Sequence, residues 1–279
     1  MIAQAFDYAA PKTLDEAMTL IAAGAKPLAG GMSLIPMMKL RLAAPEQLVD
    51  LARVKDLNYI RESGNQLHIG ATATHYAVES SALVRAKCPL LAAAAASIGD
   101  VQVRNVGTIG GSVAHADPAA DYPAALQALD AQIVIRGAKS ERTVSAADFF
   151  VDAFTTALET GEIVREIVVP MEDSSTSYQK APQPASGFAL VGVAVRVRKN
   201  GDRIASARIG VTGLANKSFR ASAAEKALEG TAGTAADVQK AAALVPQGVD
   251  ANSDLHASAD YRKHLASVYA ARALTAALS

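Results

Sequence analysis

Residues 105–121 read NVGTIGGSVAHADPAAD, and this stretch decides most of what the sequence predicts. Two adjacent glycines, Gly110 and Gly111, follow a β-branched pair and precede a serine. Because glycine lacks Cβ, such a pair can adopt positive φ angles and lets a phosphate or another backbone come close. Successive N–H groups in such a turn form a concave anion-binding nest, and the hydroxyls of Thr108 and Ser112 add donors at its rim. The stretch therefore predicts a phosphate-binding loop.

A second glycine pair occurs earlier in the chain, in residues 29–33, AGGMS. Each pair follows an apolar run and precedes an expected helix start, where the helix dipole favours a bound anion. Neither is a P-loop, because no Gly-Lys-Ser/Thr follows, and the spacing is not that of a Rossmann G-x-G-x-x-G turn. One Gly-Gly-x-Ser is commonly only a turn, whereas two together favour a ligand with adjacent phosphates, such as a dinucleotide. Spacing alone predicts no more than this.

The composition excludes several classes of protein. The chain has 279 residues, which predicts about two domains, and its 27 basic residues balance its 27 acidic residues. A net charge of zero argues against nucleic-acid or membrane-surface binding driven by bulk charge. The lone cysteine, Cys88, excludes a disulfide framework and an iron–sulfur cluster held by this chain, and we expect it to be buried. Without a signal peptide or a transmembrane run, a soluble cytoplasmic protein is expected.

Apolar periodicity and turn residues predict a mixture of helices and strands. Residues 13–16 form a capping box that begins a helix, which Gly24 ends. Ser33 and Asp121 are expected to cap the helices that follow the two glycine segments. Residues 172–186, rich in Ser, Pro and Gln, are expected to form a linker or mobile loop. The expected strands cover residues 27–29, 48–51, 57–61, 66–70, 133–135, 162–169, 188–198 and 203–214, and the further helices cover 74–84, 89–98, 146–150, 221–228, 237–244 and 259–278.

Few side chains suit acid–base or nucleophilic chemistry. The five histidines show no metal-ligand spacing, and no Gly-x-Ser-x-Gly elbow occurs. His68 alternates with apolar neighbours and is expected to face solvent, and His115 is a weaker ligand candidate because such loops bind through the backbone. Asp117 and Asp121 are better explained as a turn residue and a helix cap than as a carboxylate pair. We therefore predict no catalytic residue and no metal site, as expected where a cofactor performs the chemistry.

The glycine segments and their flanks resemble a known family. Residues 29–41, AGGMSLIPMMKLR, with 108–112, TIGGS, and 116–121, ADPAAD, are similar to the FAD-binding medium subunits of molybdenum hydroxylases. These enzymes form the xanthine dehydrogenase and aerobic carbon monoxide dehydrogenase family. The likeness extends over nearly the whole chain, including residues 161–164 before the strand that ends at Pro170. The two motifs, in this order and at this separation, are specific as a pair.

The resemblance implies an α+β fold in two domains. Residues 1–172 would form an FAD-binding domain of the vanillyl-alcohol-oxidase (PCMH) type, with subdomains at about 1–56 and 57–172. Residues 173–279 would form a smaller domain of antiparallel sheet plus helices, of the carbon monoxide dehydrogenase flavoprotein type. The implied FAD-binding residues are Ala29, Gly30, Gly31, Met32, Ser33, Thr108, Ile109, Gly110, Gly111, Ser112, Asp121, Val164 and Lys180.

These residues have different implied roles. The glycine segments would carry the FAD diphosphate, and Asp121 would bind near the flavin's sugar-like or ring portion. Val164 and Lys180 match positions that line the isoalloxazine ring. Met32 stands where relatives often carry His, Gln or Thr, so only its backbone is expected to take part.

The resemblance also implies partner chains. In this family a molybdopterin subunit oxidises the substrate, a small subunit with two [2Fe–2S] clusters relays electrons, and FAD passes them to an external acceptor. A dimer of such heterotrimers is expected. Two alternatives remain: a self-sufficient FAD-dependent oxidoreductase of the same fold, resembling the cell-wall UDP-N-acetylmuramate dehydrogenases, or a non-redox nucleotide-binding module. The sequence does not identify the oxidised substrate or the acceptor.

Overall fold

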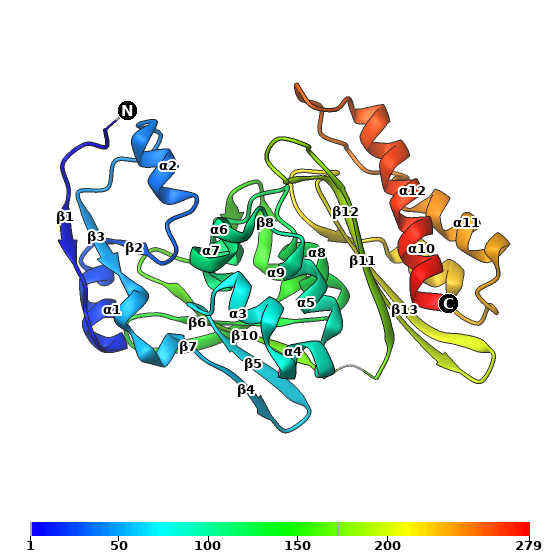
Figure 1. The fold of residues 1–279 in the computed structure, drawn as a ribbon, viewed down its shortest axis with the longest axis horizontal. Coiled ribbons are helices and arrows are strands. Elements are labelled where there is room, and N and C mark those ends of the chain that lie inside the picture. Colours follow the sequence, from blue (N-terminus) through cyan, green and yellow to red (C-terminus); the bar gives the residue numbers. More distant parts are fainter. Residues whose placement is uncertain (1, 172) are drawn as a thin grey trace.

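A computed structural model describes residues 2–171 and 173–279 of the chain, so residue 172, the predicted end of the first domain, lies outside it. Figure 1 shows an N-terminal unit, a central unit and a C-terminal unit that follow one another across the molecule. Each has its own β-sheet, and helices and strands mix as an α+β fold requires.

The N-terminal unit is a small parallel sheet, in the order β1-β3-β2, with a helix against it. The predicted capping box is confirmed: Thr13 Oγ1 accepts from the Glu16 N–H, and the Glu16 carboxylate accepts from the Thr13 N–H. This unit buries its own hydrophobic cluster, which includes Met18 and Val49. Its elements are β1 (Asp7–Ala9), α1 (Leu14–Ala22), β2 (Lys26–Leu28), α2 (Leu34–Lys39) and β3 (Gln47–Asp50), followed by two 3-10 turns, Leu51–Arg53 and Lys55–Leu57.

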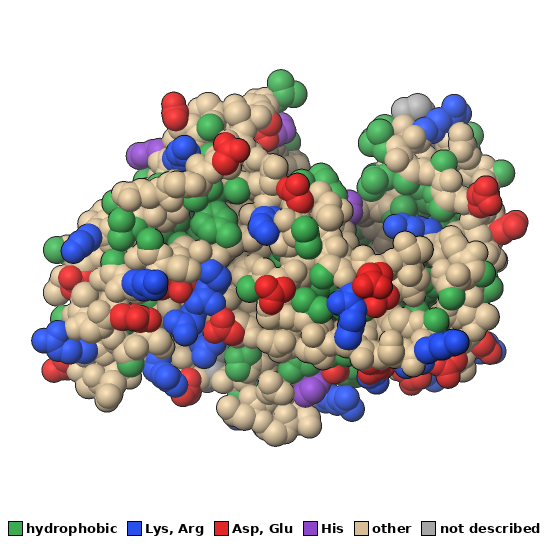
Figure 2. All heavy atoms as spheres, turned by 180° about the vertical axis from the view of Figure 1, so that it is seen from behind, with side chains coloured by type: hydrophobic (Ala, Val, Ile, Leu, Met, Phe, Trp, Pro, Cys, Tyr) green, Lys and Arg blue, Asp and Glu red, His purple; other side chains and the backbone are tan. Residues whose placement is uncertain are grey.

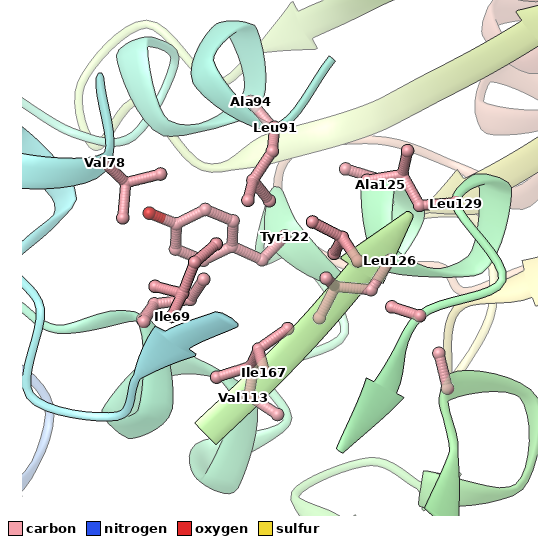
Figure 3. Close-up of a cluster of buried hydrophobic side chains, with 14 of the residues drawn as sticks. Ile69, Val78, Leu91, Ala94, Val113, Tyr122, Ala125, Leu126, Leu129 and Ile167 are labelled. Carbon is pink, nitrogen blue, oxygen red and sulfur yellow. The ribbon is translucent and has the colours of Figure 1, made fainter. Parts of the chain in front are cut away.

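The central unit is a five-stranded antiparallel sheet in the order β4-β5-β10-β6-β7, with helices over one face. Tyr122 is fully buried in its core, where Ile69, Leu91 and Ile167 from sheet and helices surround the ring (Figure 3). The strands are β4 (Ile60–Ser63), β5 (Gln66–Gly70), β6 (Gln132–Arg136), β7 (Glu141–Ser145), β10 (Ile163–Pro170) and the separate pair β8 (Phe150–Asp152) and β9 (Thr155–Thr156). The helices are α3 (His75–Ser80), α4 (Ala82–Lys87), α5 (Pro89–Ala96), α6 (Val101–Val106), α7 (Ile109–His115), α8 (Tyr122–Ala128) and α9 (Ala146–Phe149).

The C-terminal unit is a four-stranded antiparallel sheet in the order β11-β12-β13-β14. Helix α12 packs on it from outside, and α8 of the central unit packs on it from inside. Every residue of α8 is buried, because both units cover it. Gly210 lies at the closest approach, where a side chain would overlap the carbonyl oxygen of Ala124. The elements are β11 (Ser175–Pro182), β12 (Ala189–Asn200), β13 (Arg203–Thr212), β14 (Phe219–Arg220), α10 (Ser222–Leu228), α11 (Ala235–Leu244) and α12 (Ala259–Leu278).

Several local predictions are confirmed. The hairpin around Asn200 and Gly201 joins β12 to β13, and Gly201 has a positive φ. Cys88 is fully buried, next to the Pro89 that begins the alanine-rich helix α5. In the described part of the chain, no helix is both long enough and apolar enough to cross a membrane.

Two predictions of secondary structure are wrong. The expected linker at 172–186 contains β11, which pairs along its length with β12. The polar composition of this segment predicted a loop. In the folded chain it forms a strand, because pairing with β12 and burial of Tyr178 and Ala181 outweigh the low strand propensity of its residues. The expected helix at 74–84 is two helices, since the chain turns at Ser81, whose hydroxyl accepts from the Val84 N–H and caps the second.

The contact at Gly210 can be tested by unfolding. In Gly210→Ala the new methyl group would meet the Ala124 carbonyl, so α8 and β13 must move apart. We expect the free energy of unfolding to fall by about 1–3 kcal/mol, as in overpacked cores. Gly137→Ala is the control, because the nearest neighbour of its new methyl, Ser140 O, is 3.6 Å away. Equal denaturant midpoints for the two variants would contradict this account.

Candidate functional site

The two glycine segments are in contact in the folded chain. Gly30 abuts the backbone of the other segment: a Cβ there would overlap the Val106 carbonyl oxygen and lie 2.7 Å from Gly107 Cα. A Cβ on Gly111 would lie 3.9 Å from the Ala29 side chain. The contact joins the N-terminal unit to the central unit. Seen from behind, the surface is hollowed between these same two units (Figure 2).

The first segment is a loop with unengaged donors. Gly31 has a φ of +69°, a conformation that favours glycine. Among the described residues, no acceptor is found for the consecutive N–H groups of Gly30, Gly31, Met32 and Ser33. Ser33 lies at the N-cap of α2, but its hydroxyl makes no capping bond, so that expectation is wrong. The loop is partly exposed and presents a row of neutral donors of the kind that forms an anion nest.

The second segment is helical where a loop was expected. Gly110 and Gly111 lie in the first turn of α7 and neither has a positive φ. The N–H groups of Ile109 and Gly110 bond to the carbonyls of Ala73 and Ala71, at 3.0 and 2.9 Å. A sequence of two glycines permits a nest but does not require one, and here these N–H groups already have acceptors.

The second segment still contributes an open surface. Thr108 caps α7 by accepting from the Gly111 N–H at 3.2 Å, so its hydroxyl is partly used by the helix. Gly110 has a packing role, because a side chain there would overlap Ala71. Gly111 is exposed on the side of Ala29. The Ser112 hydroxyl is without a hydrogen-bond partner among residues 2–171 and 173–279.

A buried ion pair joins two of the other predicted residues. Asp121 occupies the N-cap position of α8 but does not cap it, so that expectation is wrong. Its carboxylate instead accepts from Tyr178 Oη at 2.6 Å and from Lys180 Nζ at 3.0 Å, and its Oδ1 forms an ion pair with the same Nζ at 2.8 Å. Lys180 also donates to the Ser97 carbonyl at 2.8 Å. Burial raises the pKa of Asp121 to about 6, although Lys180 and Tyr178 act in the opposite direction.

His75 lies between Gly107 and Tyr122, the residue after Asp121, and no sequence pattern indicated this position. Its Nε2 lies against Gly107, where a Cβ would be 2.6 Å away, and its Nδ1 lies 3.2 Å from the hydroxyl of Tyr122, the residue after Asp121. Burial, helped by the charge of Arg104, lowers the pKa of His75 to about 4. The imidazole is therefore neutral near pH 7. A Thr-His pair before a helix is common, so only the fold identifies it.

Helix α6 separates the two parts of the candidate site. Ser97, which accepts from Lys180, precedes α6, and Gly107, which contacts Gly30, follows it. Six residues of α-helix span about 9 Å. The helix has no buried residue, and Val101 and Val106 are 57% and 50% exposed. A short helix with exposed valines thus lies in the chain between Ser97, which contacts the buried cation, and Gly107, which contacts the donor loop.

The remaining residues are placed as follows. Ile109 and Val164 belong to the hydrophobic core, at 0% and 4% exposure. His115 ends α7 against Phe154, and burial lowers its pKa. Asp117 forms the expected turn by accepting from the Ala119 N–H. His68 alternates with the fully buried Leu67 and Ile69, is itself partly buried, and its Nδ1 lies 3.1 Å from a carboxylate oxygen of Glu166.

Comparisons with known proteins give one consistent family. Residues 4–172 match the FAD binding domain in molybdopterin dehydrogenase, and residues 176–277 match the CO dehydrogenase flavoprotein C-terminal domain. The carbon monoxide dehydrogenase medium chain of Hydrogenophaga pseudoflava is 42% identical, over 99% of this chain and 98% of that one. The glyceraldehyde dehydrogenase medium chain of Sulfolobus acidocaldarius is 38% identical, over 96% of each chain.

The fold agrees with solved structures. Carbon monoxide dehydrogenase from Hydrogenophaga pseudoflava, in a form that lacks the Mo-pyranopterin moiety of the molybdenum cofactor, gives a TM-score of 0.96 at 44% identity. The match covers 99% of this chain and 98% of that chain. The expected fold class, an FAD-binding domain followed by a smaller domain of sheet plus helices, is confirmed.

The position of His75 predicts a pH dependence of stability. Its pKa is depressed in the fold, so its contribution to stability is complete above its ordinary pKa of 6.5 and is lost as the pH falls through about 4. Between those values the free energy of unfolding should decline by about 3 kcal/mol more in the wild type than in His75→Gln. Urea titrations at several pH values measure this. The control, His256→Gln at an exposed position, should follow the wild-type curve; parallel curves for wild type and His75→Gln would refute the assignment.

Proposed function

The chain belongs to the family of FAD-binding medium subunits of molybdenum hydroxylases, and we propose that it binds FAD where its two glycine segments meet and passes electrons from an iron–sulfur chain to an external acceptor. The observation that carries the proposal is the contact of Gly30 with Val106 and Gly107, beside a loop of unengaged N–H groups. The assignment of individual residues to FAD is part of the proposal.

The residues at this contact suit a diphosphate. The N–H groups of residues 30–33 offer a row of donors without acceptors, and the positive φ of Gly31 gives the loop its turn. The hydroxyls of Ser33 and Ser112 supply further donors from the two segments. Gly111 keeps the surface between them open, since its nearest neighbour across the contact is the Ala29 side chain. We assign these groups to the phosphates, with Thr108, Ile109 and Gly110 fixing the helix that presents Gly111 and Ser112.

The isoalloxazine ring is assigned to the other end of α6. Lys180 provides a positive charge there, and Asp121 and Ser97 hold it in place. Helix α6 lies in the chain between Ser97, which accepts from Lys180, and Gly107, which contacts Gly30. Val164 would support the ring from the core. When bound, FAD supplies the exchange of single electrons with clusters and of electron pairs with an acceptor.

The partners follow from the family and from what this chain lacks. One cysteine, which is buried, leaves no ligand set for an iron–sulfur cluster on this chain. We therefore assign the [2Fe–2S] clusters to a small subunit and molybdopterin to a large one, in a dimer of heterotrimers. A carbon monoxide dehydrogenase and a glyceraldehyde dehydrogenase both contain medium chains similar to this one. This supports the proposal that another chain of the complex determines the substrate. The domain boundary at 172 and 173 and the cytoplasmic location stay predictions.

Purification of the native complex tests the partners. The tagged chain, isolated from its own host, should carry FAD and co-purify with one chain containing iron and labile sulfide and another containing molybdenum. An autonomous flavoenzyme would instead purify alone and turn over a substrate without partners. A non-redox module would purify without flavin absorbance. Either of the last two results would reject the proposed function.

Gly111→Val tests the diphosphate position. The branched side chain would enter the space beside Ala29 and would also crowd the Thr108 hydroxyl, 2.8 Å from the new Cβ. We expect FAD content to fall at least about tenfold, which is a loss of 1.4 kcal/mol or more, while the fold persists. Flavin absorbance per chain measures this, with circular dichroism as the check on folding. Gly137→Val, remote from the segments, is the control; unchanged FAD content in Gly111→Val would remove this residue from the site.

A further inference from the structure

The C-terminal sheet holds the segment before Asp121 by its backbone. The Gly213 N–H donates to the Pro118 carbonyl at 2.7 Å, and the Ala189 N–H donates to the Ala119 carbonyl at 3.1 Å. Thr212 Oγ1 lies 2.8 Å from both the Pro118 and the Ala120 carbonyl oxygens. Consecutive carbonyls of one segment are thus held by β12, β13 and the turn after β13. This segment cannot shift unless the sheet shifts with it.

The same sheet supplies the partners of the Asp121 carboxylate. Lys180, Gly192 and Thr212 lie side by side across β11, β12 and β13. Gly192 leaves the room that the Tyr178 hydroxyl occupies, because a Cβ there would overlap that hydroxyl and lie 2.9 Å from Thr212 Cγ2. Tyr178 is then free to donate to Asp121 at 2.6 Å. The neighbouring residues Lys180, Gly192 and Thr212 of this sheet therefore help to hold both the Asp121 carboxylate and the backbone before Asp121.

Both oxygens of Asp121 are used within the protein. Oδ1 accepts from Tyr178 and lies 2.8 Å from the Lys180 ammonium, and Oδ2 accepts from Lys180. The carboxylate is 4% exposed and the Lys180 side chain 8% exposed. A buried charge that loses its partner is costly, so the pair moves as a unit. Asp121 is consequently placed to hold Lys180, and Lys180 is the member with a further N–H to donate.

We propose that Tyr178 and Thr212 of the C-terminal sheet are positioning residues of the flavin site, because they fix Asp121 and, through it, the Lys180 ammonium. The inference rests on the proposed function, which places Lys180 at the isoalloxazine ring. The inference extends the proposed site from the glycine segments to the C-terminal unit, which contains neither segment. The C-terminal unit then determines the environment of the ring and not only the stability of the chain.

The test uses Tyr178→Phe and Thr212→Val in the full chain. Each variant removes one hydroxyl and keeps the shape of the side chain. Tyr59→Phe is the matched control, since Tyr59 also donates to a buried carboxylate, that of Glu166, in the central sheet. Thr212→Ser keeps the hydroxyl and should restore what Thr212→Val loses. The readouts are the Kd for FAD, from quenching of flavin fluorescence, and the midpoint potential of the bound flavin.

If the Lys180 ammonium is displaced, it should bind the flavin more weakly. It should also stabilise the reduced flavin, which is the more negative form, to a smaller extent. We expect Tyr178→Phe and Thr212→Val to raise the Kd about tenfold, the effect of losing one hydrogen bond to a charged group, and to make the potential more negative. Tyr59→Phe should change neither. A merely structural role would lower the melting temperature of all these variants without moving the potential.

The outcomes separate the two claims. If the wild-type chain takes up no FAD, the proposed function fails. If the wild type binds FAD and both hydroxyl variants retain its Kd and potential, the positioning role alone is overturned. A shift of equal size in Tyr59→Phe would also overturn it, because the effect would then be general. Should Thr212→Val not fold, Tyr178→Phe decides the question by itself.

Discussion

The units of this fold are joined where two backbones touch without a side chain between them. Gly30 meets Val106 and Gly107 between the N-terminal and central units, and Gly210 meets Ala124 between the central and C-terminal units. At both positions an added methyl group would overlap a carbonyl oxygen. Protein interiors tolerate such overlap poorly, because close packing leaves no space for neighbours to move into. The glycines thus set the distances between units, and those distances place the groups of the site.

The proposed site combines neutral donors in the first glycine segment with one buried cation, Lys180. No bulk charge is needed for a phosphate when a loop offers unengaged N–H groups, which agrees with a chain of zero net charge. The cation is different, because a buried ammonium requires a partner. Asp121 and Ser97 meet that requirement, and Tyr178 of the C-terminal sheet holds Asp121 by a hydrogen bond. His75 stays neutral, so it adds contact without adding charge.

The sequence predicts a helix cap or a hairpin correctly where the residues that form it are close together in the chain. The capping box at Thr13 and the hairpin at Asn200 and Gly201 depend on residues a few positions apart, and both formed as expected. The conformation of Gly110 and Gly111 was not predicted, since the Ala73 and Ala71 carbonyls that accept from Ile109 and Gly110 belong to another part of the chain. Lys180 and Asp121 are 59 residues apart. Their pairing, and the strand that replaces the expected linker, depend on tertiary burial that periodicity does not report.

The late position of Lys180 and Thr212 in the chain has a consequence for biosynthesis. Ribosomes release the N-terminal and central units first, and domains generally fold as they emerge. The carbonyls of Pro118 to Ala120 can be hydrogen-bonded only after β12 and β13 have been synthesised. Prematurely terminated chains would possess both glycine segments yet lack the proposed lysine contact. Flavin loading should therefore be a post-translational event, and incomplete polypeptides should compete poorly for the cell's FAD.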